Sequence, residues 1–216
     1  VHDGLKRMYV DNENKIYYIT VYNENYTMPE MPSGAEEGIK RGLYRYQVSG
    51  KKATKGVKAH LFGSGSIMQQ VLKAAELLED EGISTDVWSA TSWVELYRDG
   101  VATQRWNLLH PGKPERKSWL QQQLDKEQGV FVSANDWMRV VAGQCAPWMP
   151  KDFLALGTDG YGLSDSRENL RDYFEISPRY IAFAAVRLLQ QQGKVSDKAV
   201  TDFMEKYGID GDKMDP

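Results

Sequence analysis

The stretch that decides the fold is Lys58-Ala-His-Leu-Phe-Gly-Ser-Gly-Ser66. Residues 58–62 have the apolar and aromatic character of a buried strand, and the glycines at 63 and 65 end that strand. A helix is expected directly afterwards, because apolar residues recur at 3.6-residue spacing. These residues are Ile67, Val71, Leu72, Ala75 and Leu78. A strand that leads straight into a one-sided helix predicts a domain in which strands and helices alternate.

The alternation continues in both directions from this stretch. Further strands are expected at 45–48, 85–90, 129–133 and 153–156. Helices are expected at 35–44, 93–97, 119–124, 136–142, 167–174 and 180–192, followed by a last one that Gly208 ends; Ser177 and Ser196 are expected to cap the last two. Residues 98–117 contain Gly100 and two prolines and are expected to be irregular. The pattern predicts a three-layer αβα domain with a mostly parallel sheet.

The first 33 residues follow a different pattern. Residues 2–9 are typical of the end of a helix, and residues 15–22 are β-branched and aromatic, which predicts a buried strand. Residues 23–32 contain two prolines and no periodicity, as an extended connector does. A helix end and one strand cannot form a core, so we expect a piece of a longer polypeptide. The strand is then expected to be disordered, swapped or paired with another chain.

Composition and charge narrow the functional classes. The 216 residues include 27 Lys and Arg against 30 Asp and Glu, a net charge of −3, and the basic residues are scattered. This pattern favours neither a nucleic acid nor a membrane as partner, and no apolar run approaches the roughly 20 residues that span a bilayer. Cys145 is alone, so it forms no internal disulfide or thiolate zinc site, which fits a reducing cytoplasm. The three histidines, His2, His60 and His110, are too far apart for a local metal motif.

Two glycine-containing turns are candidate binding sites. Gly63–Ser66 lies where backbone N–H groups can hold a phosphate, but it has neither a third glycine nor the lysine of a P-loop. We therefore favour a tight packing turn over a phosphate cradle. Residues 157–170 form the densest polar stretch and follow a strand. A partner-contacting loop and a loop stabilised by Asx turns and an Asp165–Arg167 pair fit this stretch equally well.

The remaining chemically versatile residues favour structural roles. His110, next to a proline, is expected to bond to local backbone, and Cys145 to pack as a small hydrophobe. The six tryptophans are expected to be mostly core, with one or two interface anchors. No carboxylate pair, catalytic triad or metal cluster is recognisable, so the residues alone do not indicate an enzyme.

Several segments resemble one known family in a single register. They are Tyr17-Tyr-Ile-Thr20, Asn23-Glu-Asn-Tyr26, Met28-Pro-Glu-Met-Pro32, Gly34-Ala-Glu-Glu-Gly38, Leu61-Phe-Gly-Ser-Gly-Ser66, Asp99-Gly100, Arg105-Trp-Asn-Leu-Leu-His-Pro111, Leu156-Gly-Thr-Asp-Gly-Tyr-Gly162 and Ser164-Asp-Ser-Arg-Glu-Asn-Leu-Arg171. The family is the bacterial homodimeric pyruvate dehydrogenase component, which depends on thiamine diphosphate. The chain resembles its C-terminal region from Val1 to about Pro216.

The resemblance implies a division of the chain and of the chemistry. Residues 1–22 would be the end of the pyrimidine-binding middle domain, 23–33 a linker, and 34–216 a transketolase-type C-terminal domain with a five-stranded mixed sheet. In the family, other parts of the subunit hold thiamine diphosphate and magnesium and supply the catalytic histidines. The resemblance therefore implies that this chain contains no catalytic, cofactor-binding or metal-binding residue and is inactive by itself.

The implied role is indirect. The parent enzyme decarboxylates pyruvate and acetylates lipoyl groups of the dihydrolipoyl acetyltransferase core in the cytoplasm. This chain would complete the subunit, contact a second copy in the homodimer and shape the active-site rim through Asp159, Tyr161, Ser164, Arg167 and Glu168. Two alternatives remain open: a non-catalytic assembly or docking module, and an independent nucleotide-binding domain that uses Gly63–Ser66.

Overall fold

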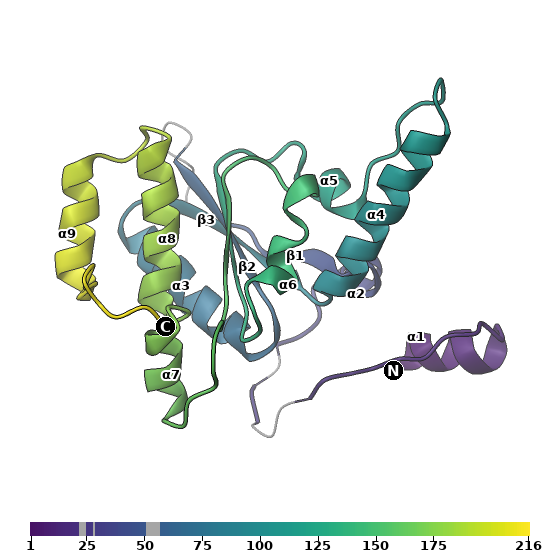
Figure 1. Ribbon diagram of the computed structural model, residues 1–216, viewed down its shortest axis with the longest axis horizontal. Helices are drawn as coiled ribbons and strands as arrows, with labels where there is room; N and C mark the ends of the chain where they lie inside the picture. The colour runs from purple at the N-terminus through teal and green to yellow at the C-terminus, as the bar shows by residue number, and fades with distance from the viewer. Residues whose placement is uncertain (22–24, 28, 51–56) are drawn as a thin grey trace.

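The fold is built on one five-stranded sheet. The computed structural model describes residues 1–21, 25–27, 29–50 and 57–216 (Figure 1). The strands are β1 (Leu43–Gln47), β2 (Lys58–Gly63), β3 (Ser84–Ala90), β4 (Val130–Ala134) and β5 (Phe153–Leu156), in the spatial order β1-β3-β2-β4-β5. β1 runs antiparallel to β3, and all other pairs are parallel. The predicted mixed, mostly parallel sheet is confirmed.

Helices cover both faces of this sheet. One face carries α3 (Met68–Asp80), α8 (Pro178–Gln191) and α9 (Asp197–Tyr207); the other carries α4 (Trp93–Leu109), α5 (Trp119–Leu124), α6 (Val140–Gly143) and the 3₁₀ turn η3 (Ala146–Trp148) (Figure 1). Successive strand residues point to opposite faces. Leu61 and Val132 therefore pack into the core under α3 and α8, while Phe62 and Phe131 pack under α4 and α5. The remaining helical elements are α1 (His2–Leu5), the π-helical η1 (Lys6–Val10), α2 (Glu36–Arg41), η2 (Gly65–Ile67) and α7 (Arg167–Tyr173).

The prediction that residues 98–117 are irregular is wrong for the first half of this segment, because α4 continues to Leu109. Gly100 is the reason for the error. A Cβ on Gly100 would lie 2.5 Å from Trp148 Cδ2, far inside contact distance. The glycine therefore allows the helix to approach an indole ring closely and does not end the helix.

Other boundaries also move for local reasons. The helix expected at 35–44 ends at Arg41, because Gly42 takes a left-handed conformation with φ 98° and β1 starts at once. The helix expected at 136–142 is shorter in the structure and begins only at Val140, as α6. Before it, the Trp137 N–H donates to the Asn135 side chain and the Arg139 N–H donates to the Asp159 side chain. Ser196 caps α9 as predicted.

The cap predicted at Ser177 is confirmed in position, because Ser177 directly precedes α8, but its side chain makes no capping bond. Its hydroxyl donates to Asp172 Oδ1 at 3.1 Å and does not accept a bond from the first turn of α8. The proline that follows it does stand at the start of the helix, as predicted.

The described part of the N-terminal segment, residues 1–21, 25–27 and 29–33, forms no strand. Residues 15–21 are extended without strand pairing; Tyr22, the end of the predicted strand, and residues 23, 24 and 28 of the predicted linker lie outside the described residues. Ile16, Tyr18 and Val21 are 94%, 89% and 86% exposed. An ion pair of 3.9 Å joins Asp3 to Lys40 of the main domain. A strand needs a partner, and the described part of the chain offers none here.

Candidate functional site

The order in which strands are added to the sheet reverses between β2 and β4. From β2 the chain crosses to β3 on one side, and from β4 it crosses to β5 on the other. The helices that follow these two strands, α3 and α6, lie on opposite faces. In open α/β sheets, a crevice forms outside the strands at such a switch point, and ligands bind there.

A cavity of about 380 Å³ opens at this point. Ser66 follows β2 and Asp136 follows β4; the Ser66 hydroxyl donates to Asp136 Oδ2 at 3.2 Å and closes the crevice at its base. The Thr158 hydroxyl donates to the carbonyl of Asp136 at 3.1 Å. The outer wall consists of the loop after β5 and of α7, with Gly160, Tyr161, Gly162, Leu163, Arg167, Leu170 and Arg171.

Two of the five predicted rim residues line this cavity, and the other three lie elsewhere in the loop and in α7. Tyr161 and Arg167 line it, and Tyr161 is 95% exposed. Asp159 instead holds the base of the loop: it accepts from the Arg139 N–H at 3.0 Å and pairs with the Arg139 guanidinium, which lowers the pKa of Asp159. Ser164 is exposed in the loop, and Glu168 is exposed in the first turn of α7. Their role at an active-site rim stays a prediction.

The expected self-stabilised loop is partly confirmed. Asp165 Oδ1 accepts from the Ser166 N–H at 2.6 Å and from the Asn169 side chain at 2.9 Å, which lowers the pKa of Asp165. Asp165 is therefore held by its own turn and by Asn169. Ser166 caps α7 through the Asn169 N–H.

The turn Gly63–Ser66 is a packing turn, as favoured above. A Cβ on Gly63 would lie 2.8 Å from Met68 Sδ, so the glycine serves helix–strand packing. The Ser64 hydroxyl accepts from Trp93 Nε1 at 2.9 Å and donates to the Ala90 carbonyl at 3.0 Å, which binds the turn to β3 and α4. Nothing in this geometry favours an independent nucleotide site at the turn.

The roles predicted for two single residues are confirmed. His110 Nδ1 lies 2.7 Å from the Trp106 carbonyl, and its ring stacks on the Trp106 ring. Cys145 is fully buried in the core below α4, and burial raises the pKa of its thiol to about 12.

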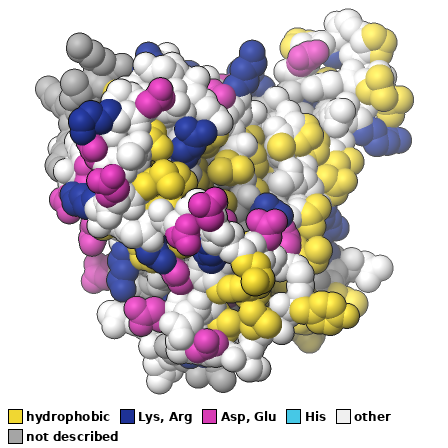
Figure 2. Space-filling model, turned by 60° about the vertical axis from the view of Figure 1, so that its left-hand side comes forward, with side chains coloured by type: hydrophobic (Ala, Val, Ile, Leu, Met, Phe, Trp, Pro, Cys, Tyr) yellow, Lys and Arg dark blue, Asp and Glu magenta, His cyan; other side chains and the backbone are white. Residues whose placement is uncertain are grey.

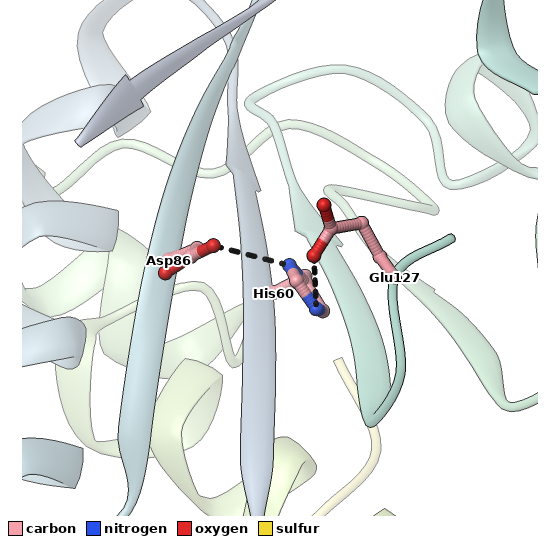
Figure 3. A group of neighbouring side chains, drawn as sticks. All are labelled: His60, Asp86 and Glu127. Carbon is pink, nitrogen blue, oxygen red and sulfur yellow. Dashed lines mark ion pairs between the residues drawn. The ribbon is translucent and has the colours of Figure 1, made fainter. Parts of the chain in front are cut away.

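A second cluster of ionisable groups lies on the inner strands of the sheet. His60 of β2, Asp86 of β3 and Glu127 before β4 converge beneath the α4 and α5 layer (Figure 3). Trp88 Nε1 donates to His60 Nδ1 at 3.2 Å, so the ring proton resides on Nε2, which lies 3.1 Å from the Gln128 carbonyl. Burial and the nearby Lys58 ammonium lower the pKa of His60 to about 4. The histidine is therefore neutral at pH 7.

The charges around this histidine balance without a metal ion. Lys58 Nζ lies 2.9 Å from Asp86 Oδ2 and 3.5 Å from Glu127 Oε2, and Arg45 pairs with both carboxylates. The Ser49 N–H also donates to Asp86, and with Lys58 it outweighs burial and lowers the pKa of Asp86. Two cations thus already occupy the space a metal ion would take, and both nitrogens of His60 are engaged. The donor set does not suit a divalent cation.

The buried neutral histidine predicts acid sensitivity. In the unfolded chain His60 recovers its ordinary pKa of 6.5, against about 4 in the fold, so the unfolded state binds the proton more readily between these values. Stability is present above pH 6.5 and falls as the pH is lowered toward 4. We expect this residue to account for a loss of about 2 kcal/mol between pH 7 and pH 5. Urea titrations of wild type and His60→Gln at both pH values measure it, and equal pH slopes would contradict it.

Known protein families match this chain in two segments. The family model described as "Transketolase-like TK C-terminal domain" matches residues 42–177, more than half of the chain. The chain belongs to the transketolase-like C-terminal domain family. A second model, "Pyruvate dehydrogenase E1 component middle domain", matches residues 1–29.

The curated relatives of this transketolase-like chain are pyruvate dehydrogenase E1 components. That of Escherichia coli strain K12 is 46% identical over 220 residues, covering 100% of this chain and 24% of the relative. That of Pseudomonas aeruginosa is 42% identical over 218 residues, with the same coverage. The chain thus spans about a quarter of the length of these relatives, and the predicted resemblance to their C-terminal region is confirmed. A solved transketolase from Leishmania mexicana matches at 17% identity and a TM-score of 0.45, covering 72% of this chain and 19% of that one.

Among the residues that the structure describes, neither the Gly63–Ser66 turn nor the His60 cluster fits a thiamine diphosphate and magnesium site. The Gly63–Ser66 turn is filled by packing contacts, and the carboxylates near His60 already pair with Lys58 and Arg45. We derive no catalytic step through the cofactor from this chain. Among the described residues, no helix is long and apolar enough to cross a membrane.

Sequence reasoning missed two residues that connect the loops of the cavity, and it missed the His60 cluster. Asp136 and Arg139 connect the loop after β4 to the loop after β5, where their partners Thr158 and Asp159 lie 22 and 20 residues away. The other partner of Asp136, Ser66, lies 70 residues away. The position of Asp136 and Arg139 just after a strand was the available signal. The His60 cluster had a weaker signal, since Lys58 and His60 alternate along one strand and Asp86 lies in the next.

Proposed function

We propose that the chain is the C-terminal part of a pyruvate dehydrogenase (acetyl-transferring) component. The observation that carries this proposal is similarity to E1 components along the whole chain, at 46% and 42% identity in two bacteria. The enzyme would decarboxylate pyruvate on thiamine diphosphate and acetylate lipoyl groups of the dihydrolipoyl acetyltransferase core. Thiamine diphosphate and magnesium would be bound outside this chain, and the enzyme would work as a homodimer in the cytoplasm.

In this proposal the chain serves two neighbouring domains. Residues 34–216 form the C-terminal domain, and residues 1–22 complete the middle domain across the linker 23–33. The exposed apolar side chains of Ile16, Tyr18 and Val21 support the second assignment. Apolar side chains of this kind are typical of a strand that helices cover on both faces of its sheet.

A chimaera tests the proposal. The corresponding quarter of the Escherichia coli E1 component is replaced by this chain, and pyruvate-dependent acetylation of a lipoyl domain is measured. We expect turnover on the order of the intact relative. A chimaera carrying Leu61→Asp, which places a charge in the core, is the inactive control. A soluble, dimeric chimaera without activity would contradict the proposal.

The rim role is tested by Asp159→Ala in the same chimaera. The substitution removes both bonds to Arg139 and releases the base of the cavity loop, so we expect turnover to fall several-fold with the fold intact. Asp202→Ala, which removes an exposed pair with Lys198 on α9, is the matched control. Unchanged turnover together with unchanged dimer affinity would exclude a role for the loop.

One observation supports an assembly role for the chain. Exposed apolar side chains follow one stripe of α4 at helical spacing. Val94, Tyr97, Val101 and Leu108 are 54%, 37%, 40% and 78% exposed. Figure 2 shows hydrophobic side chains gathered along one side of the molecule below a projecting lobe. A stripe of this kind is typical of a surface that another protein covers.

We propose that a second copy of the chain covers these exposed α4 side chains in the dimer. Val101→Lys places a charge at the centre of the stripe and is expected to weaken self-association at least ten-fold, as measured by analytical ultracentrifugation of the chimaera. Ala102→Lys adds the same charge one residue away on the other exposed flank of α4 and should leave the dimer unchanged. Equal dimer affinity in both variants would exclude α4 from the interface.

A further inference from the structure

The cavity at the switch point has the size and composition of a small-molecule site. Its volume of about 380 Å³ lies within the usual range for ligand pockets. It is formed by segments that follow three different strands, β2, β4 and β5, and by α7. The bonds of Asp136 to Ser66 and Thr158, and of Asp159 to Arg139, hold these segments in place.

The lining divides into a cationic part and an apolar part. Arg167 and Arg171 are four residues apart on α7, so they lie on the same face of the helix and both border the cavity. The apolar part comprises Ile67, Leu163, Leu170, Phe174 and Ile176. Ile67 and Ile176 are buried at 0% and 1% exposure and belong to the rigid core.

Arg171 is placed to receive an anion. Its Nη2 lies 3.4 Å from the hydroxyl of Tyr26, a long contact that occupies one of five N–H donors. A guanidinium presents these donors in a planar fork that matches a carboxylate or a phosphate. The Asp136 carboxylate, which accepts from the Ser66 hydroxyl, is the acidic group of the lining and would repel an anion from that end. The charge distribution therefore orients a ligand.

We propose that this cavity binds a small organic anion, with its carboxylate or phosphate on Arg171 of α7 and an attached apolar group against Ile67 and Phe174. This assignment is independent of the proposed function, because it uses only the residues around the cavity. It differs from the phosphate cradle considered for Gly63–Ser66, since the anion contacts a side chain of α7 and not the backbone of that turn.

Four probes separate the contributions of charge and apolar surface. Phenylacetate and phenyl phosphate carry both features, phenylacetamide replaces the charge with a neutral amide, and inorganic phosphate lacks the apolar group. Each is titrated into the full 216-residue chain while amide chemical shifts are followed by NMR. We expect phenylacetate or phenyl phosphate to bind with a Kd in the range of about 0.1–1 mM and to shift signals of residues 158–171. The stronger of the two tells whether the site prefers a carboxylate or a phosphate.

Phenylacetamide and inorganic phosphate are each expected to bind at least ten-fold more weakly. Arg171→Gln should weaken binding of the stronger probe at least ten-fold, and Leu163→Ser about three-fold, since Leu163 is a half-exposed loop residue whose replacement does not threaten the fold. Arg98→Gln, an exposed arginine on α4, should have no effect.

Three results would overturn the proposal. The first is no shift near the cavity with any probe. The second is equal binding of inorganic phosphate and phenyl phosphate, which would indicate surface charge alone. The third is binding that Arg171→Gln leaves unchanged while its amide spectrum shows an intact fold.

Discussion

Replacing Asp86 with alanine is expected to lower the free energy of unfolding by about 3–5 kcal/mol, because the substitution removes a buried carboxylate and leaves Lys58 and Arg45 with Glu127 as their one shared counter-charge. The Asp86 side chain is 1% exposed and pairs with Lys58 at 2.9 Å. The Ser49 N–H, which donates to Asp86 at 3.0 Å, also loses its acceptor. Urea unfolding at pH 7, followed by tryptophan fluorescence, measures the loss.

Two further variants show whether charge is the cause. Asp86→Leu combined with Lys58→Met removes both members of the pair and should recover most of the loss, since an apolar pair carries no desolvation cost. Asp202→Ala removes an exposed pair with Lys198 and should cost less than about 1 kcal/mol. A double variant as unstable as Asp86→Ala would show that the shape of the strand, and not the lost counter-charge, decides the stability.

Gly100→Ala is expected to destabilise the fold by about 3 kcal/mol. The new Cβ would lie 2.5 Å from the Trp148 ring, so α4 or the indole must move within a packed core. Helix propensity alone predicts the opposite sign, because alanine is favoured over glycine in a helix by about 1 kcal/mol. Thermal and urea unfolding give the sign directly.

The matched control is Gly143→Ala. Gly143 is also helical, at the end of α6, and a Cβ there would have no neighbour within 4 Å. This variant should be neutral or slightly more stable. A stabilised Gly100→Ala protein would mean that the close contact with Trp148 does not limit the position of α4.

The parts of the fold that depend on local sequence were predictable. The strand at 58–62 and the helix after it follow from a short apolar run, two glycines and one helical stripe, and the structure has both. The error at α4 has a tertiary cause. Gly100 has the same local appearance as a helix breaker, and only the position of Trp148, distant in sequence, shows why the helix needs it.

The candidate sites were predictable only as regions. The loop after β5 was identified because it follows a strand and is rich in glycine and charge. Its partner Arg139 lies in another crossover, and no local pattern connects the two. The His60 cluster depends on the registration of β2 with β3, which pairs His60 directly with Asp86. A residue pattern within one strand does not contain that registration.

The order in which the two faces of the sheet are covered has a consequence for synthesis on the ribosome. The side of β4 that bears Val132 is covered by α8, which follows all five strands in the chain. At a translation rate of about 5–20 residues per second, this apolar surface stays open for several seconds after β4 has been made. During that interval the nascent chain offers a binding surface to chaperones, and substitutions that slow the appearance or docking of α8 should lower the yield of soluble protein before they lower its final stability.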